Sequence, residues 1–147
     1  MVDIQLTEHR AEIERLLAYI PWLEEKSGTT VAKVYNDNDL SKTSVSFPVY
    51  DATLLSFVKE ADATGLMYDN YRYIYSAYGL KTFEDERRAI EDAGVKDGDV
   101  LCGILTRYVK GGITKGIVWT DAVREGIFLL VLKKMKKLLE IWDAPLA

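Results

Sequence analysis

The sequence predicts a mainly α (α+β) fold: a single-domain bundle of about five or six helices around a buried C-terminal helix, with a small β-hairpin. Three observations support this prediction. The length of 147 residues suits one domain, which we place at residues 1–147. Apolar residues recur at helical spacings in several segments. Residues 127–132 are wholly apolar, so we expect other elements to surround them.

The first part of the chain is expected to form a helix followed by the hairpin. Thr7 begins a helical pattern that Pro21 should stop or kink, because proline lacks the amide N–H of a helix interior. Between residues 29 and 50 the helical period disappears, and two short β-prone runs flank a polar loop. This pattern indicates two paired strands.

Two helices are expected in the middle of the chain. Asp51 is placed to open the first, and Gly65 to terminate it. The second follows Thr82, whose hydroxyl can form a capping box with Asp85, and it should end at Gly94. The acidic side chains in its first turn are explained by the helix dipole.

A helix rich in tyrosine is expected between these two, at about residues 69–78. Its aromatic residues Tyr68, Tyr71, Tyr75 and Tyr78 recur at spacings of three and four and would share one face, with Arg72 among them. Tyrosine is favoured in binding surfaces, so these five residues are a candidate interaction site. The alternative is a half-buried structural stripe with solvated hydroxyl groups.

The C-terminal part should contain two helices joined by a glycine-rich elbow. The first helix covers residues 100–109, and the elbow residues 107–116. The second helix should run from Thr120, as its N-cap, to about residue 142.

Residues 101–139 resemble the C-terminal signature of a bacterial family catalogued as domain of unknown function 6508. In that signature a basic helix end, a glycine elbow and a Glu-Gly pair precede an aliphatic helix. The matching residues here are Arg107, Gly116, Glu125 and Gly126. The resemblance implies no activity, because none is assigned to the family.

The elbow is also a candidate anion site. Glycines can leave backbone N–H groups free to bind an anion, and Arg107, Lys110 and Lys115 are close in sequence. Glu125 is the best acidic candidate for such a site, although it could equally form a structural ion pair. The structural alternative for the paired glycines is a helix C-cap. No nucleophile–base set, cofactor motif or metal motif is present, so we expect no catalytic residues, no cofactor and no metal.

Charge and hydropathy limit the function classes. The net charge of −4 combines −7 over residues 1–98 with +3 over residues 99–147, which argues against direct nucleic-acid binding. No apolar run reaches the length of about 18 residues that a membrane span needs. The N-terminus also lacks a signal-peptide pattern. These features predict a cytoplasmic protein without membrane association.

We therefore expect a non-enzymatic protein-interaction module of a bacterium or mobile element. Its acidic part suggests an inhibitor or regulator of a basic, nucleic-acid-handling partner. Its partner is another protein, and a homodimer remains open. The alternative is a small anionic-ligand binder or an enzyme that uses the glycine-rich elbow.

Overall fold

The computed structural model describes residues 6–28, 32–36 and 46–143. Within these residues a short 3-10 helix, η1 (Leu6–His9), precedes eight α-helices. The α-helices are α1 (Arg10–Leu17), α2 (Ile20–Lys26), α3 (Ala52–Asp62), α4 (Tyr71–Tyr78), α5 (Phe83–Asp92), α6 (Gly98–Thr114), α7 (Ile117–Arg124) and α8 (Ile127–Asp143). Two strands, β1 (Ala32–Asn36) and β2 (Ser46–Tyr50), lie between α2 and α3.

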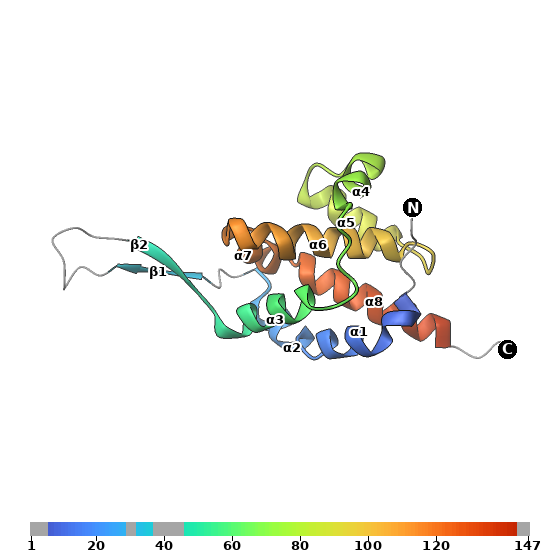
Figure 1. The fold of residues 1–147 in the computed structure, drawn as a ribbon, viewed down its shortest axis with the longest axis horizontal. Helices are drawn as coiled ribbons and strands as arrows, with labels where there is room; N and C mark the ends of the chain where they lie inside the picture. Colours follow the sequence, from blue (N-terminus) through green and yellow to red (C-terminus); the bar gives the residue numbers. More distant parts are fainter. Residues whose placement is uncertain (1–5, 29–31, 37–45, 144–147) are drawn as a thin grey trace.

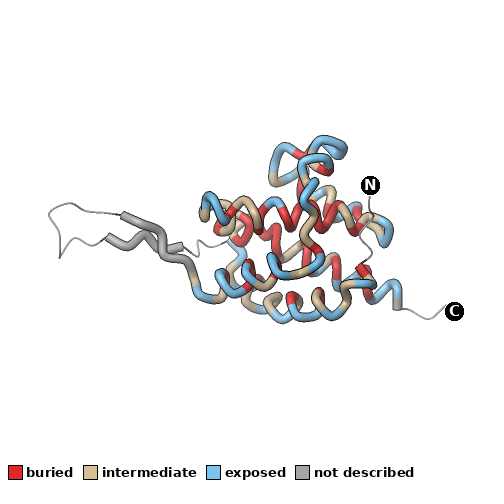
Figure 2. The backbone as a smooth tube through the Cα atoms, viewed as in Figure 1, coloured by how far each residue is buried: buried red, intermediate tan, exposed pale blue. Residues whose placement is uncertain are grey.

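The core lies around the two longest helices, α6 and α8, which have 17 residues each. Helices α1 to α3 lie on one side of this pair and α4 on the other (Figure 1). Buried residues gather where these helices face each other (Figure 2). The ring of Phe128 on α8 makes edge contacts with Phe57 on α3 and Tyr108 on α6, at centroid distances of 4.9 and 6.2 Å. The expected burial of the C-terminal helix is confirmed, and α6 shares its central place.

The prediction of about five or six helices is wrong, because two predicted helices are each divided. The first breaks between Leu17 and Ile20, and Pro21 then occupies the first turn of α2, where its missing N–H costs nothing. The last breaks at Gly126, whose positive φ of 74° ends α7 and starts α8 in a new direction.

The α+β part of the predicted fold class also needs correction, because the packed bundle consists of helices alone and the two strands lie outside it. Strands β1 and β2 pair antiparallel with Val34 opposite Pro48, and they extend away from the helices (Figure 1). They add no layer to the bundle. The predicted polar loop of the hairpin covers residues 36–44; Asn36 belongs to β1, and residues 37–44 lie outside the described residues.

The predicted glycine-rich elbow at residues 107–116 is wrong for most of its length, because α6 continues as a helix to Thr114 and only Lys115 and Gly116 form the turn. Gly111 and Gly112 therefore lie inside a helix, where glycine is normally unfavourable. Their role is close packing: a Cβ atom on Gly112 would overlap the indole ring of Trp119 on α7. That indole donates a hydrogen bond to the carbonyl of Val109 at 2.9 Å. The connection between the helices is the short turn around Lys115 and Gly116.

Two details of the predicted last helix are also wrong. Thr120 is not an N-cap but a buried residue inside α7, and its hydroxyl donates to the carbonyl of Ile117 at 2.9 Å. The apolar run at residues 127–132 is not buried on every side, because Leu129 and Leu130 are only half-buried. Helix α8 therefore lies at the centre of the bundle with one broad buried face, and its remaining side is partly exposed to solvent.

Candidate functional site

Helix α4 carries most of the predicted tyrosine surface and packs on α6. Its one buried residue is Ile74, which lies so close to Gly103 of α6 that an added Cβ would be 3.0 Å from its side chain. Tyr71 and Tyr75 are half-buried, whereas Tyr78 is 52% exposed. Tyr68 lies before the first residue of the helix, so it does not share the predicted helical face.

A buried carboxylate, that of Glu86 on α5, lies beneath α4. Glu86 is only 3% exposed, and each of its oxygens accepts a hydrogen bond from a tyrosine hydroxyl. Tyr75 of α4 donates to Oε2, and Tyr108 of α6 donates to Oε1 at 2.5 Å. The carboxylate thus connects α4, α5 and α6 and has the partners that a buried charge requires.

The sequence reasoning missed Glu86, because the helix dipole already explained the acidic first turn of this helix. The available signal was its position four residues before Ile90, which is also buried. Residues at this spacing share a helix face, so Glu86 had to point toward the core with Ile90.

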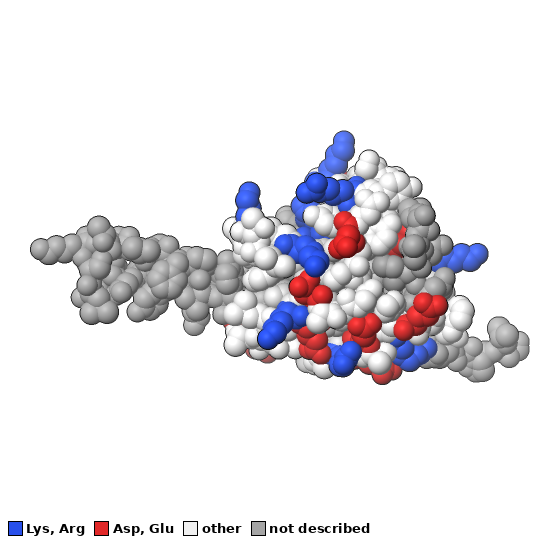
Figure 3. All heavy atoms as spheres, viewed as in Figure 1, with Lys and Arg blue, Asp and Glu red and all other residues white. Residues whose placement is uncertain are grey.

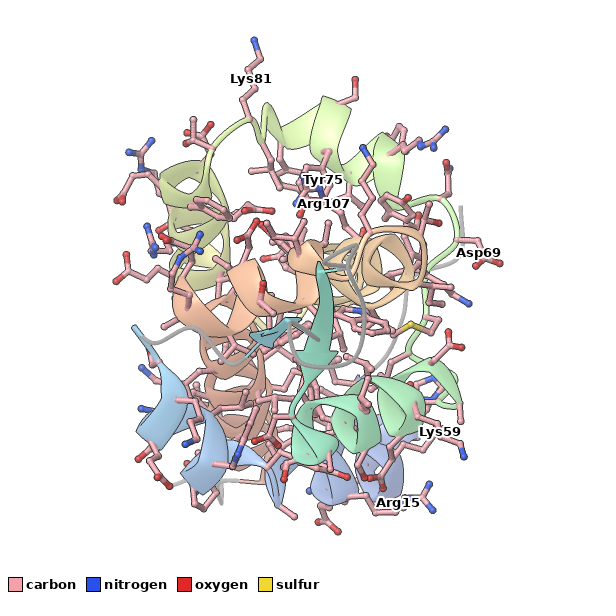
Figure 4. All side chains as sticks on the ribbon, turned by 90° about the vertical axis from the view of Figure 1, so that its left-hand side faces the viewer. Arg15, Lys59, Asp69, Tyr75, Lys81 and Arg107 are labelled. Atoms are coloured by element: carbon pink, nitrogen blue, oxygen red, sulfur yellow. The ribbon has the colours of Figure 1, made fainter. Side chains whose placement is uncertain are left out.

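Arg107 of α6 contacts Glu86, Tyr75 and Tyr108 on the side that faces solvent, and we call these four residues the Glu86 cluster. Its guanidinium lies 4.7 Å from the ring centroid of Tyr108 and 5.2 Å from that of Tyr75. Its Nη1 atom is 3.6 Å from Oε2 of Glu86, while 44% of the side chain remains exposed. Arg107 and Tyr75 lie next to each other beneath α4 (Figure 4). The rings and the carboxylate therefore hold a cation in a defined position at the surface.

The electrostatics of the cluster follow from burial and from these contacts. Burial raises the pKa of the Tyr75 and Tyr108 phenols, and the adjacent Glu86 carboxylate raises both pKa values further. Burial acts to lower the pKa of Arg107, but the two phenols and Glu86 outweigh it and leave that pKa raised. Both phenols therefore stay protonated as donors to Glu86, and Arg107 stays charged.

Two adjoining pockets open around Arg107. One, of about 350 Å³, is lined by Leu80, Phe83, Tyr108 and Val118 as well as by Glu86. The other, of about 440 Å³, is lined by Tyr71, Arg72 and Gly111. Tyr75, Arg107 and Val118 line both pockets, so Arg107 lies at the wall that the pockets share. Pockets of this size accommodate small organic ligands.

The structure thus joins parts of two separate predictions. Arg107 comes from the predicted anion site, and Tyr71, Arg72 and Tyr75 come from the predicted interaction site. The other predicted anion-site residues lie elsewhere: Lys110 pairs with Asp62 of α3 at 2.7 Å, and Glu125 pairs with Arg87 of α5 at 2.6 Å.

The hydrogen bond to Arg87 lowers the pKa of Glu125, so Glu125 acts as one half of an ion pair between α5 and the end of α7. Lys115 is exposed in the turn that follows α6. Lys81 contributes to the lining of the smaller pocket, but its side chain extends away from Arg107 into solvent (Figure 4).

Charge on the surface is mixed. On the face drawn in Figure 3, basic side chains lie over the part of the molecule that carries α4, and acidic and basic side chains alternate over the helices below it. The acidic excess of residues 1–98 therefore does not form a single acidic face in this view.

Residues 8–141 match the family described as "Family of unknown function (DUF6508)". This match spans most of the 147 residues. The chain belongs to this family. The resemblance expected from its C-terminal signature is therefore confirmed and extends to the N-terminal helices. No curated protein and no solved structure matches the chain. Among the described helices of this family member, none is long and apolar enough to cross a membrane.

The tyrosine–carboxylate contacts can be tested through stability. Replacing Tyr108 with phenylalanine keeps the ring but leaves Oε1 of the buried Glu86 without its donor. We expect Tyr108→Phe to lower the free energy of unfolding by about 1.5–3 kcal/mol, the range for hydrogen bonds to charged groups. Urea unfolding followed by circular dichroism measures this. Tyr73→Phe, at a tyrosine 46% exposed, is the matched control and should change it by less than about 0.5 kcal/mol.

Proposed function

We propose that this protein binds an anionic ligand in the two adjoining pockets, with the guanidinium of Arg107 as the main contact. The observation that carries the proposal is the position of that guanidinium at the shared wall, held over Tyr75 and Tyr108 and still 44% exposed. A cation held in place before binding loses little side-chain entropy when a ligand arrives.

Arg107 retains donors for a ligand. Guanidinium carries five N–H groups in a planar fork that matches carboxylate and phosphate oxygens. The carboxylate of Glu86 lies 3.6 Å away, beyond the length of a strong hydrogen bond, and it already accepts from two tyrosines. Arg72 lines the larger pocket and adds a second positive charge beside the first.

The proposal predicts that anions stabilise the protein at low ionic strength. Inorganic phosphate at millimolar concentration should raise the melting temperature above its value at equal ionic strength in chloride, because binding to the native state alone stabilises it. Arg107→Gln should abolish this rise. Arg15→Gln should preserve it, because Arg15 is exposed on α1 at the opposite end of the molecule from Arg107 (Figure 4).

Arg72→Gln gives a second variant, since Arg72 is exposed and its loss leaves the Glu86 cluster intact. It should weaken the anion effect without lowering the ligand-free melting temperature. The proposal is wrong if phosphate, sulfate and acetate all fail to stabilise the protein. It is equally wrong if stabilisation persists in both the Arg107 and Arg72 variants.

A second candidate is the protein-interaction role, which we propose for the outer surface of α4. Tyr73 and Tyr78 of this helix are 46% and 52% exposed, and α4 lies at the edge of the bundle (Figure 1). Large exposed aromatic rings are common in binding surfaces. In this version the chain is a cytoplasmic bacterial protein that regulates or inhibits its partner. Capture of one defined partner by the native protein, lost in a Tyr73→Ser, Tyr78→Ser double variant that stays folded, would support this role.

A further inference from the structure

We propose, building on the anion site described above, that the ligand is an aromatic anion: a carboxylate or phosphate group attached to a flat ring. The anionic group contacts Arg107 and Arg72, and the ring enters the smaller pocket. This inference names the class of ligand and rests on the proposed function.

The lining of the smaller pocket supports the ring. Its walls include the apolar side chains of Leu80, Phe83 and Val118 as well as the aromatic ring of Tyr108. A bare inorganic ion would contact the cation and leave the half-buried side chains of Phe83 and Val118 in contact with water, whereas Leu80 and Tyr108 are already buried. The ring of an organic ligand removes apolar surface of both the ligand and the pocket from water, which is favourable in proportion to the area buried.

The shape of the site favours a ring over a flexible chain. Phe83 of α5 offers a half-buried aromatic surface to a pocket of about 350 Å³, and the ring of Tyr108 on α6, which is only 1% exposed, adds a buried aromatic wall. Aromatic rings pair in stacked or edge-to-face arrangements and add stabilisation beyond the area that they bury. A flat ligand also loses less conformational entropy on binding than a flexible chain of similar size.

The arrangement of charges supports an anion at one end of the ligand. The two arginines occupy the larger pocket and the shared wall, whereas the smaller pocket contains the buried Glu86 carboxylate. Glu86 repels an anion placed deep in that pocket, because like charges at close range are unfavourable in an environment of low polarity. The ligand is therefore oriented with its charge at Arg107 and its uncharged ring toward Phe83.

Two matched pairs of small molecules test this inference. Phenyl phosphate is compared with inorganic phosphate, and benzoate with acetate, by isothermal titration calorimetry at low ionic strength. Within each pair the main difference is the aromatic ring. Comparison of the two pairs shows whether the site prefers a phosphate or a carboxylate as the anionic group. We expect the ring to tighten binding by about tenfold or more in at least one pair. Benzyl alcohol, which has the ring without the charge, should not bind measurably.

Variants assign the ring to its pocket. Phe83→Leu should reduce the advantage of the ring while leaving the affinity for inorganic phosphate unchanged. Trp142→Leu removes an exposed aromatic side chain near the end of α8 and should change neither value. Ligand-free melting temperatures show that each variant is folded.

The outcomes separate the two proposals. If inorganic phosphate or acetate binds in an Arg107-dependent way and the ring adds nothing in either pair, the aromatic ligand is excluded and the anion site stands. If the ring adds affinity but Phe83→Leu does not reduce it, the assignment to the smaller pocket is overturned. If none of the anions binds, both proposals are wrong.

Discussion

Replacement of Phe128 with alanine should lower the free energy of unfolding by about 3–5 kcal/mol, the largest effect that we expect of any single substitution here. Phe128 is fully buried, and its ring contacts Phe57 of α3 and Tyr108 of α6. Alanine removes these contacts and leaves a cavity where three helices meet, which the surrounding rings can only partly fill. For a domain of this size the loss is a large fraction of the total stability.

The neighbouring residue on α8 gives the control for this prediction. Leu129 is only half-buried, so Leu129→Ala should cost clearly less than Phe128→Ala. Urea unfolding of both variants, with the m-value compared to that of the parent protein, measures the difference. Equal losses at the two positions would contradict the one-sided packing of α8.

Replacement of Gly112 with alanine is expected to destabilise the protein by about 1–3 kcal/mol or more, as overpacking does. The sign of this effect is informative, because glycine to alanine inside a helix normally stabilises by up to about 1 kcal/mol. At Gly112 the new methyl group would overlap the indole of Trp119, whose Nε1 atom is hydrogen-bonded to Val109. The indole would have to move, and α7 would separate from α6.

Gly111 provides the comparison, since it lies in the same helix one residue earlier. A Cβ there would meet a methyl group of Val118 at 3.3 Å, which a small shift of that side chain relieves. Gly111→Ala should therefore cost much less than Gly112→Ala. Thermal unfolding and tryptophan fluorescence report stability and the environment of Trp119. A stabilised Gly112→Ala variant would show that α6 and α7 do not pack as described.

Capping residues that lie close together in the sequence correctly predicted where two helices begin. The capping box of Thr82 and Asp85 is confirmed, with the Asp85 N–H donating to the Thr82 hydroxyl at 3.1 Å. The N-cap of α3 is also confirmed, because the side chain of Asp51 accepts from the N–H of Thr53 at 2.7 Å. These contacts join residues two or three positions apart, so the sequence alone contains both partners.

Several of the wrong predictions concern the glycines of the C-terminal half. Gly111 and Gly112 indicated a break in the helix, whereas α6 continues through them to Thr114 and the turn comes at Lys115 and Gly116. A further break, which the sequence did not indicate, comes at Gly126. A glycine can serve backbone freedom or close packing, and its neighbours in sequence do not distinguish the two. At Gly112 the deciding atom belongs to Trp119, on the next helix.

By itself, the sequence determined that the chain is mainly helical, where two helices are capped, that the last helix is buried, and that the chain is a member of the DUF6508 family. Only the tertiary structure decided the candidate site. Glu86 meets Tyr75 and Tyr108 across 11 and 22 positions of the chain. Such contacts depend on how helix faces pack, whereas caps and periodicity depend on neighbours within about one turn. The packing of α4, α5 and α6 therefore places Arg107, one of several basic residues in the sequence, in a defined position between two pockets.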